Sequence, residues 1–85
     1  MEPYQVYVRA KAFDFLGQVG RPERAILWNY FDALGRDPFQ PFDFTEIIAD
    51  REMSVKILNR HAITYWVDHA VKEVKIVALR DADRH

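Results

Sequence analysis

The chain has 85 residues, with twelve basic against thirteen acidic side chains and no cysteine. Without cysteine, neither disulfides nor a thiolate metal site can supplement the core of so small a domain, so large apolar groups must build it. Aromatic residues make up 14% of the chain and meet that need. The net charge of −1 lacks the positive excess typical of domains that mainly grip nucleic acid. With no signal sequence and no membrane-spanning run, we expect one soluble, cytoplasmic domain over residues 1–85.

The first part of the chain predicts a strand and a short helix. Residues 4–9 alternate between two sets of side chains, which is the period-two pattern of a half-buried strand. Apolar residues then recur at helical spacing from Ala12 to Val19. Gly17 and Gly20 are expected to end this helix and to open a turn.

A second helix follows and is the clearest element of the sequence. Pro22 suits its first turn, where a missing N–H costs nothing. Gly35 is the expected stop, and Pro38 prevents the helix from resuming. One apolar stripe is formed by Leu27, Tyr30, Phe31 and Leu34.

The second half of the chain predicts strands joined by short turns. The expected strands run over residues 42–48, 53–58, 62–67 and 71–79, with turns at Asp50–Arg51 and Asp68–Ala70. Turns this short connect antiparallel neighbours. The predicted fold is therefore α+β: an N-terminal strand, a two-helix hairpin, then an antiparallel meander of three or four strands packed against the helices. The first strand joins this sheet at an edge or inside it.

Basic residues at strand positions are the candidates for chemistry. Lys56 and Arg60 are four residues apart, so on a regular strand they share one face. Arg80 and Arg84 close the last strand and tail, with His85 beside them. If the helices cover one face, the other can present Lys56, Arg60 and an arginine from the tail together. Such a cluster suits a phosphodiester, because guanidinium groups stabilise charge on phosphorus and a histidine can shuttle a proton.

A plainer interpretation competes with this one. Charged residues on the wet face of an antiparallel sheet serve solubility, and Glu73 with Lys75 fits that description. Trp66 or Tyr65 either stacks a base or packs in the core. The histidines lack the spacing of a zinc site and the glycines do not form a phosphate loop, so we expect no metal or cofactor.

Several short segments, in a fixed order, span nearly the whole chain. They are Tyr4-x-Val6-x-Val8-Arg9, Leu34-x-x-Asp37-Pro38-Phe39, Val55–Leu58, Ala62–Ala70 and Val74–Val77. In order and spacing they resemble the RelE/ParE superfamily of type II toxin–antitoxin toxins. The resemblance implies a growth-arresting toxin that a cognate antitoxin binds and blocks. RelE-like members cleave mRNA in the ribosomal A site with a basic cluster and a C-terminal Tyr or His, whereas ParE-like members poison DNA gyrase without that cluster.

The resemblance also implies residue roles. Arg60, His85 and Glu46 are the expected catalytic residues. The residues expected to hold the RNA are Lys56, Arg80, Arg84 and Trp66. The absence of a second cation beside Lys56 and the low net charge favour two alternatives: a non-catalytic gyrase inhibitor, or a member that only binds its antitoxin. We expect the antitoxin to contact an apolar surface along the helices, near Phe13, Trp28 and Tyr30.

Overall fold

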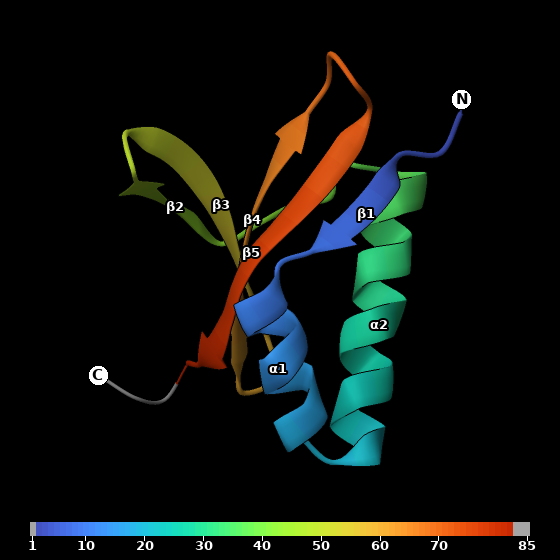
Figure 1. Cartoon of the computed structure of the whole chain (residues 1–85), viewed down its shortest axis with the longest axis vertical. Helices are drawn as coiled ribbons and strands as arrows, with labels where there is room; N and C mark the ends of the chain where they lie inside the picture. Colours follow the sequence, from blue (N-terminus) through green and yellow to red (C-terminus); the bar gives the residue numbers. More distant parts are fainter. Residues whose placement is uncertain (1, 83–85) are drawn as a thin grey trace.

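The computed structural model describes residues 2–82 and has two layers, a five-stranded sheet and a pair of helices packed on one of its faces (Figure 1). This confirms the predicted α+β class. In chain order the elements are β1 (Gln5–Val8), α1 (Ala10–Gln18), α2 (Arg21–Arg36), β2 (Phe44–Ile48), β3 (Arg51–Leu58), β4 (His61–Asp68) and β5 (Glu73–Asp81).

The strands lie in the order β1-β5-β4-β3-β2. The run from β2 to β5 is the predicted antiparallel meander, and it has four strands. The first strand pairs in parallel with the last, with Gln5 opposite Glu73 and Val8 opposite Ile76. Thus β1 forms one edge of the sheet and β2 forms the other.

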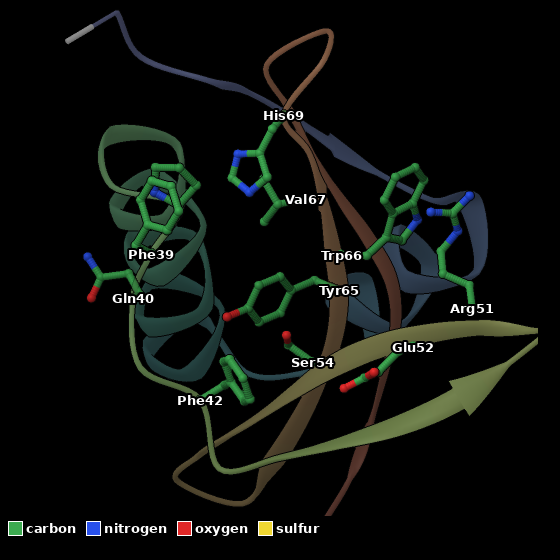
Figure 2. A pocket seen from close by; sticks show the side chains of 11 residues that line it. Phe39, Gln40, Phe42, Arg51, Glu52, Ser54, Tyr65, Trp66, Val67 and His69 are labelled. Atoms are coloured by element: carbon green, nitrogen blue, oxygen red, sulfur yellow. The ribbon is translucent and has the colours of Figure 1, made fainter.

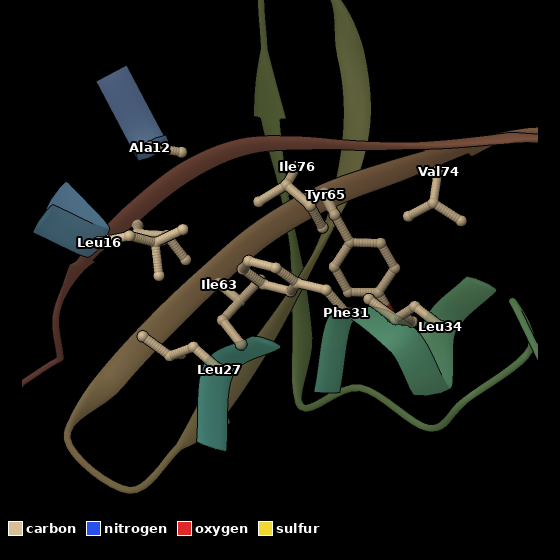
Figure 3. Packing of buried hydrophobic residues seen from close by; sticks show 10 residues of the cluster. Ala12, Leu16, Leu27, Phe31, Leu34, Ile63, Tyr65, Val74 and Ile76 are labelled. Carbon is tan, nitrogen blue, oxygen red and sulfur yellow. The ribbon is translucent and has the colours of Figure 1, made fainter. Parts of the chain in front are cut away.

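The core lies between the helix pair and the middle of the sheet (Figure 3). Phe31 and Leu27 from α2 point at Ile63 of β4, and Tyr65 lies beside Leu34. Each large apolar side chain buried this fully contributes about 1.5–3 kcal/mol relative to its exposed state. The predicted stripe of the second helix is confirmed, although Tyr30 is only half-buried.

The two helical glycines have other roles than the predicted ones. Gly17 lies inside α1, which continues to Gln18, so the prediction that it ends the helix is wrong. Gly35 lies in the last turn of α2 and has a negative φ, as the other glycines do. A Cβ at Gly35 would lie 3.0 Å from the carbonyl oxygen of Tyr4 and 3.1 Å from Cγ2 of Val6. Gly35 therefore lets β1 approach α2, and the N–H of Tyr4 donates to its carbonyl at 2.7 Å.

Strained turns connect the strands of the meander. Ala49 and Asp50 join β2 to β3 with φ values of 51° and 64°, as in the type I′ turns of tight hairpins. The predicted turn at Asp50–Arg51 is therefore one residue late, and Arg51 is the first residue of β3. After β4 the turn extends to Lys72, so that Val71 lies in the turn and not in the strand.

Candidate functional site

The register of the strands decides which candidate residues share a face, because directly opposed residues point to the same side of a sheet. Ile63 packs against the helices, and its partner on β3 is Lys56. Ala62 and Thr64 point the other way, and Arg80 is opposite Ala62. Lys56 therefore lies on the helix side while Arg80 lies on the side away from the helices, hereafter the open face. Arg80 is therefore not the tail arginine expected on one face with Lys56.

The open face carries a polar network that includes two predicted site residues. Thr64 Oγ1 donates to Glu46 Oε1 at 3.2 Å. Arg80 Nη1 donates to the same carboxylate oxygen at 3.3 Å and to Thr64 Oγ1 at 3.2 Å. The structure thus brings Glu46 and Arg80 together as an ion pair. A phosphate at this position would compete with Glu46 for the guanidinium.

Two cations contact aromatic rings on the same face. The guanidinium carbon of Arg51 lies 3.8 Å from the ring centroid of Trp66, and Lys75 Nζ lies 5.1 Å from that of Tyr7. The carboxylate of Glu73 is 2.8 Å from Lys75 Nζ and raises the pKa of that amine, so Lys75 is charged at neutral pH. Contacts of this kind hold each cation over a ring without removing it from solvent.

A hollow of about 320 Å³ opens between these pairs. Tyr7, Arg9, Trp66 and Lys75 line it, and we call it the basic groove. Sequence analysis placed Arg51 in a turn and assigned Lys75 to solubility, so it missed this arrangement. The alternation of β1 and β5 shows which residues share a face within each strand. Only the parallel register, which sets Tyr7 opposite Lys75, shows that these two residues meet.

The remaining predicted residues have separate locations. Tyr65 is buried at 2% exposure, whereas Trp66 is half-buried on the open face, which answers the question of which ring packs in the core. Arg60 lies in the turn between β3 and β4, and its carbonyl accepts the N–H of Ala82 at 2.7 Å, so this turn lies beside the end of β5. Arg84 and His85 lie outside the described residues.

A histidine–carboxylate pair joins the helices to the base of the sheet. Nε2 of the buried His61 lies 3.0 Å from Glu23 Oε2, and the ring meets Phe15 edge-on. Its Nδ1 is buried with no hydrogen-bond partner among residues 2–82. Within that same range no three His, Cys, Asp or Glu side chains group as metal ligands would. The pair connects α2 to β4.

The helices expose apolar side chains where an antitoxin surface was expected. Phe13 on α1 and Trp28 on α2 are both exposed, and so is Ile26, two residues before Trp28. Tyr30 differs from that expectation, because its hydroxyl is buried.

No helix within residues 2–82 is long and apolar enough to cross a membrane.

Comparison with known proteins gives matches in structure alone. No protein-family model and no curated protein sequence matches the chain. The archaeal RelE–RelB complex from Pyrococcus horikoshii contains a chain that matches with a TM-score of 0.81 at 19% identity, with 100% of both chains covered. A chain of the Mycobacterium tuberculosis RelBE2 toxin–antitoxin complex matches at 0.75 and 20% identity, covering 98% of this chain and 97% of that one.

The Escherichia coli RelBE toxin–antitoxin complex gives a third match, with a TM-score of 0.74, 14% identity and coverage of 95% and 99% of the two chains. The three alignments cover nearly all residues of this chain and of the matched chains. All elements described above therefore belong to the shared architecture. The sequence resemblance is confirmed at the level of the fold: this chain has the fold of the RelE toxins in these complexes.

Proposed function

We propose that this chain is the toxin of a type II toxin–antitoxin pair. The observation that carries the proposal is the match over the full length of both chains to the Pyrococcus protein, with a TM-score of 0.81. The three matched chains come from complexes named for RelB and RelE, two of them described as toxin–antitoxin complexes. The partner of this chain is accordingly a cognate antitoxin protein.

We further propose that the toxin is a ribosome-dependent mRNA endoribonuclease. The open face supports this, because single-stranded RNA is held by cations that follow its backbone and by rings on which bases stack. Lys75 and Arg9 of the basic groove would contact phosphates, and Trp66, backed by Arg51, would stack a base. Arg80 is half-exposed at the end of the same face and adds a guanidinium.

The proposed chemistry is a proton transfer beside a stabilised phosphate. Glu46, as general base, would take the proton of the RNA 2′-hydroxyl, whose oxygen attacks the adjacent phosphorus as the bond to the 5′-oxygen breaks. Arg60 stabilises charge on the phosphate from the turn beside β5, and His85 gives a proton to the leaving 5′-oxygen. Arg84 adds a further phosphate contact from the tail. An RNA phosphate that binds Arg80 would release Glu46 Oε1 from that guanidinium. Growth arrest then results from cleavage of mRNA and loss of translation.

The test is a cell-free translation reaction dosed with purified protein, with the 5′ ends of a reporter mRNA mapped by primer extension. New ends that need ribosomes support the nuclease. Lys75→Ala and Arg51→Ala should each raise the protein concentration needed for half-maximal cleavage by about tenfold. Lys11→Ala on α1 is the matched control and should leave that concentration unchanged. Lys56→Ala decides whether the helix-side lysine contributes: lost cleavage restores its predicted role, and unchanged cleavage removes it.

A second candidate is a non-catalytic toxin that inhibits DNA gyrase, or a member that only binds its antitoxin. One observation favours it: the middle of the open face is apolar, with Met53, Val55 and Ala62 buried there. Intact mRNA and normal protein yield at a dose that arrests growth would support this candidate. A DNA supercoiling assay with purified gyrase then separates gyrase inhibition from antitoxin binding alone.

A further inference from the structure

A hollow with a volume of about 360 Å³ lies between the connector that follows α2 and the strands β3 and β4 (Figure 2). Ser54 of β3 and Tyr65 of β4 line it and are directly opposed in the sheet. Tyr65 belongs to the core under the helices, so these two residues point to the helix side. We call this cavity the aromatic hollow. It shares only Trp66 with the basic groove and is therefore a separate cavity.

The connector forms one wall of the hollow, and hydrogen bonds fix both of its ends. At its start, the N–H of Phe39 donates to Asp37 Oδ1 at 3.0 Å. At its end, the N–H of Asp43 donates to the carbonyl of Val55 at 2.9 Å. Asp43 Oδ2 also accepts the N–H of Ile57 at 2.6 Å. The wall is thus in place before any ligand binds, which reduces the entropy that binding costs.

Two phenylalanine rings of this wall stay in contact with water. Phe39 is 68% exposed and Phe42 is 48% exposed. The ring of Phe39 stacks on that of His69, with centroids 5.1 Å apart and an angle of 13° between the planes. His69 Nδ1 in turn lies 2.9 Å from the hydroxyl of Tyr4. These contacts hold the Phe39 ring in place without covering it, and fixed, exposed rings beside a cavity are typical of a binding surface.

The surroundings of the hollow are acidic. The carboxylate of Glu52 lies on the wall facing the connector, with no ion-pair or hydrogen-bond partner among residues 2–82. Arg51 is the one basic residue between residues 37 and 52, and its guanidinium carbon lies 3.8 Å from the centroid of Trp66. The same stretch has five carboxylates, at Asp37, Asp43, Glu46, Asp50 and Glu52. Although Glu46 pairs with Arg80, the balance of charge repels phosphate and carboxylate ligands and attracts a cation.

The lining narrows the kind of cation. The faces of aromatic rings attract cations, and quaternary ammonium groups in particular. A primary ammonium is strongly hydrated and has three N–H groups that need acceptors. A quaternary ammonium has no N–H group, so its methyl groups can contact the rings while Glu52 balances its charge. The volume lies in the range of small-molecule sites, about 300–1,000 Å³, and suits a free compound better than a single side chain.

We propose that the aromatic hollow binds a small quaternary ammonium compound. The methylated head group lies against the rings of Phe39 and Phe42, and its positive charge faces Glu52. This site is independent of the proposed RNA contacts on the open face, and the inference does not rest on the proposed function.

The test is an NMR titration of the full chain with three probes at constant ionic strength. Choline carries the quaternary head group, its carbon analogue has the same shape without the charge, and ethanolamine has the charge on a primary ammonium. Choline should shift the amide signals of Phe39, Phe42 and Glu52 saturably and bind about tenfold tighter than either other probe. Equal binding of the carbon analogue or of ethanolamine would overturn the proposal, as would no saturable shift. Shifts centred on the exposed Trp28 of α2 would also overturn it, because they would show general stickiness.

Variants with matched controls test the two walls separately. Phe39→Leu keeps an apolar side chain but removes the ring face, and it should weaken choline binding about tenfold. Its control is Phe13→Leu, since Phe13 is 58% exposed on α1. Glu52→Gln keeps the shape but removes the charge and should weaken choline about threefold, with the exposed Asp14→Asn as its control. All four residues are exposed, so the variants should fold, and thermal unfolding without ligand checks this. Unchanged choline affinity in both hollow variants, or an equal loss in the controls, would overturn the proposal.

Discussion

Replacing Gly17 and Gly35 by alanine should change stability in opposite directions, although both glycines lie in helices. Gly17 is exposed inside α1, and nothing lies within 4 Å of a Cβ added there. Alanine removes the extra backbone entropy that glycine loses on folding, which is worth about 0.5–1 kcal/mol in a helix. For a domain of this size that gain raises Tm by about 2–8 °C.

At Gly35 the same helical gain is opposed by a clash. The new methyl group would lie 3.0 Å from the Tyr4 carbonyl oxygen, a backbone atom that cannot rotate away. Moving β1 to make room strains its 2.7 Å hydrogen bond to Gly35. Overpacking of this kind costs about 1–3 kcal/mol against a helical gain of about 0.5–1 kcal/mol. The net loss therefore centres on about 1 kcal/mol, and Tm falls by about 4–8 °C.

The assay is thermal unfolding followed by far-UV circular dichroism, with urea unfolding to confirm the free energies. The wild-type chain and both variants are measured at one protein concentration. A higher Tm for Gly35→Ala would show that β1 does not approach α2 as closely as described. A lower Tm for Gly17→Ala would place that glycine outside a regular helix. Either result refutes the assignment of roles to the two glycines.

Three further predictions concern stability. Arg24 Nε and Nη2 donate to the carbonyls of Leu16 and Val19 at 2.9 Å. Arg24→Ala should therefore lower the free energy of unfolding in urea by about 1–2 kcal/mol. Arg24→Lys, which lacks the two-pronged guanidinium, should recover less than half of that loss. Ala49→Gly should raise Tm, because alanine at positive φ costs about 1–2 kcal/mol, more than the entropy that glycine adds; a lower Tm would contradict the turn. Burial raises the pKa of Tyr30 above its usual value of about 10, so the folded state keeps a proton that the unfolded state loses, and stability should be flat below pH 9 and fall above about pH 10. Tyr30→Phe should reduce that fall in urea titrations at pH 9 and pH 11 without abolishing it, because burial also raises the pKa of Tyr65; an unchanged slope would exclude Tyr30.

The elements of this fold could be predicted because each carries its own periodicity. The apolar stripe of α2 and the alternation of β3 are local patterns. They can be recognised without knowing which other element each one packs against. The parallel pairing of β1 with β5 has no such signal, since it joins residues as far apart as Gln5 and Glu73. The C-terminal end of α1 was misplaced because glycine commonly stops a helix, whereas Gly17 lies inside α1, which continues to Gln18.

The candidate site was less predictable for a related reason. A sheet side chain changes face with a shift of one residue, so the face of a cation depends on register. Lys56 and Arg60 are four residues apart, but a turn begins at Asn59, and the rule for a regular strand does not extend to Arg60. Glu46 and Arg80 meet across two intervening strands, which only the register of the whole meander can show. The roles proposed for Arg60 and His85 stay predictions.

The parallel pairing of β1 with β5 makes the domain complete only when its last strand is present. The helices pack mainly on β4 and β5, so a growing chain that ends after α2 has a helical hairpin with nothing to cover its apolar stripe. Contacts between distant parts of a chain also form late, because a long loop has to close first. The open face therefore cannot form until β5 has joined the sheet between β1 and β4.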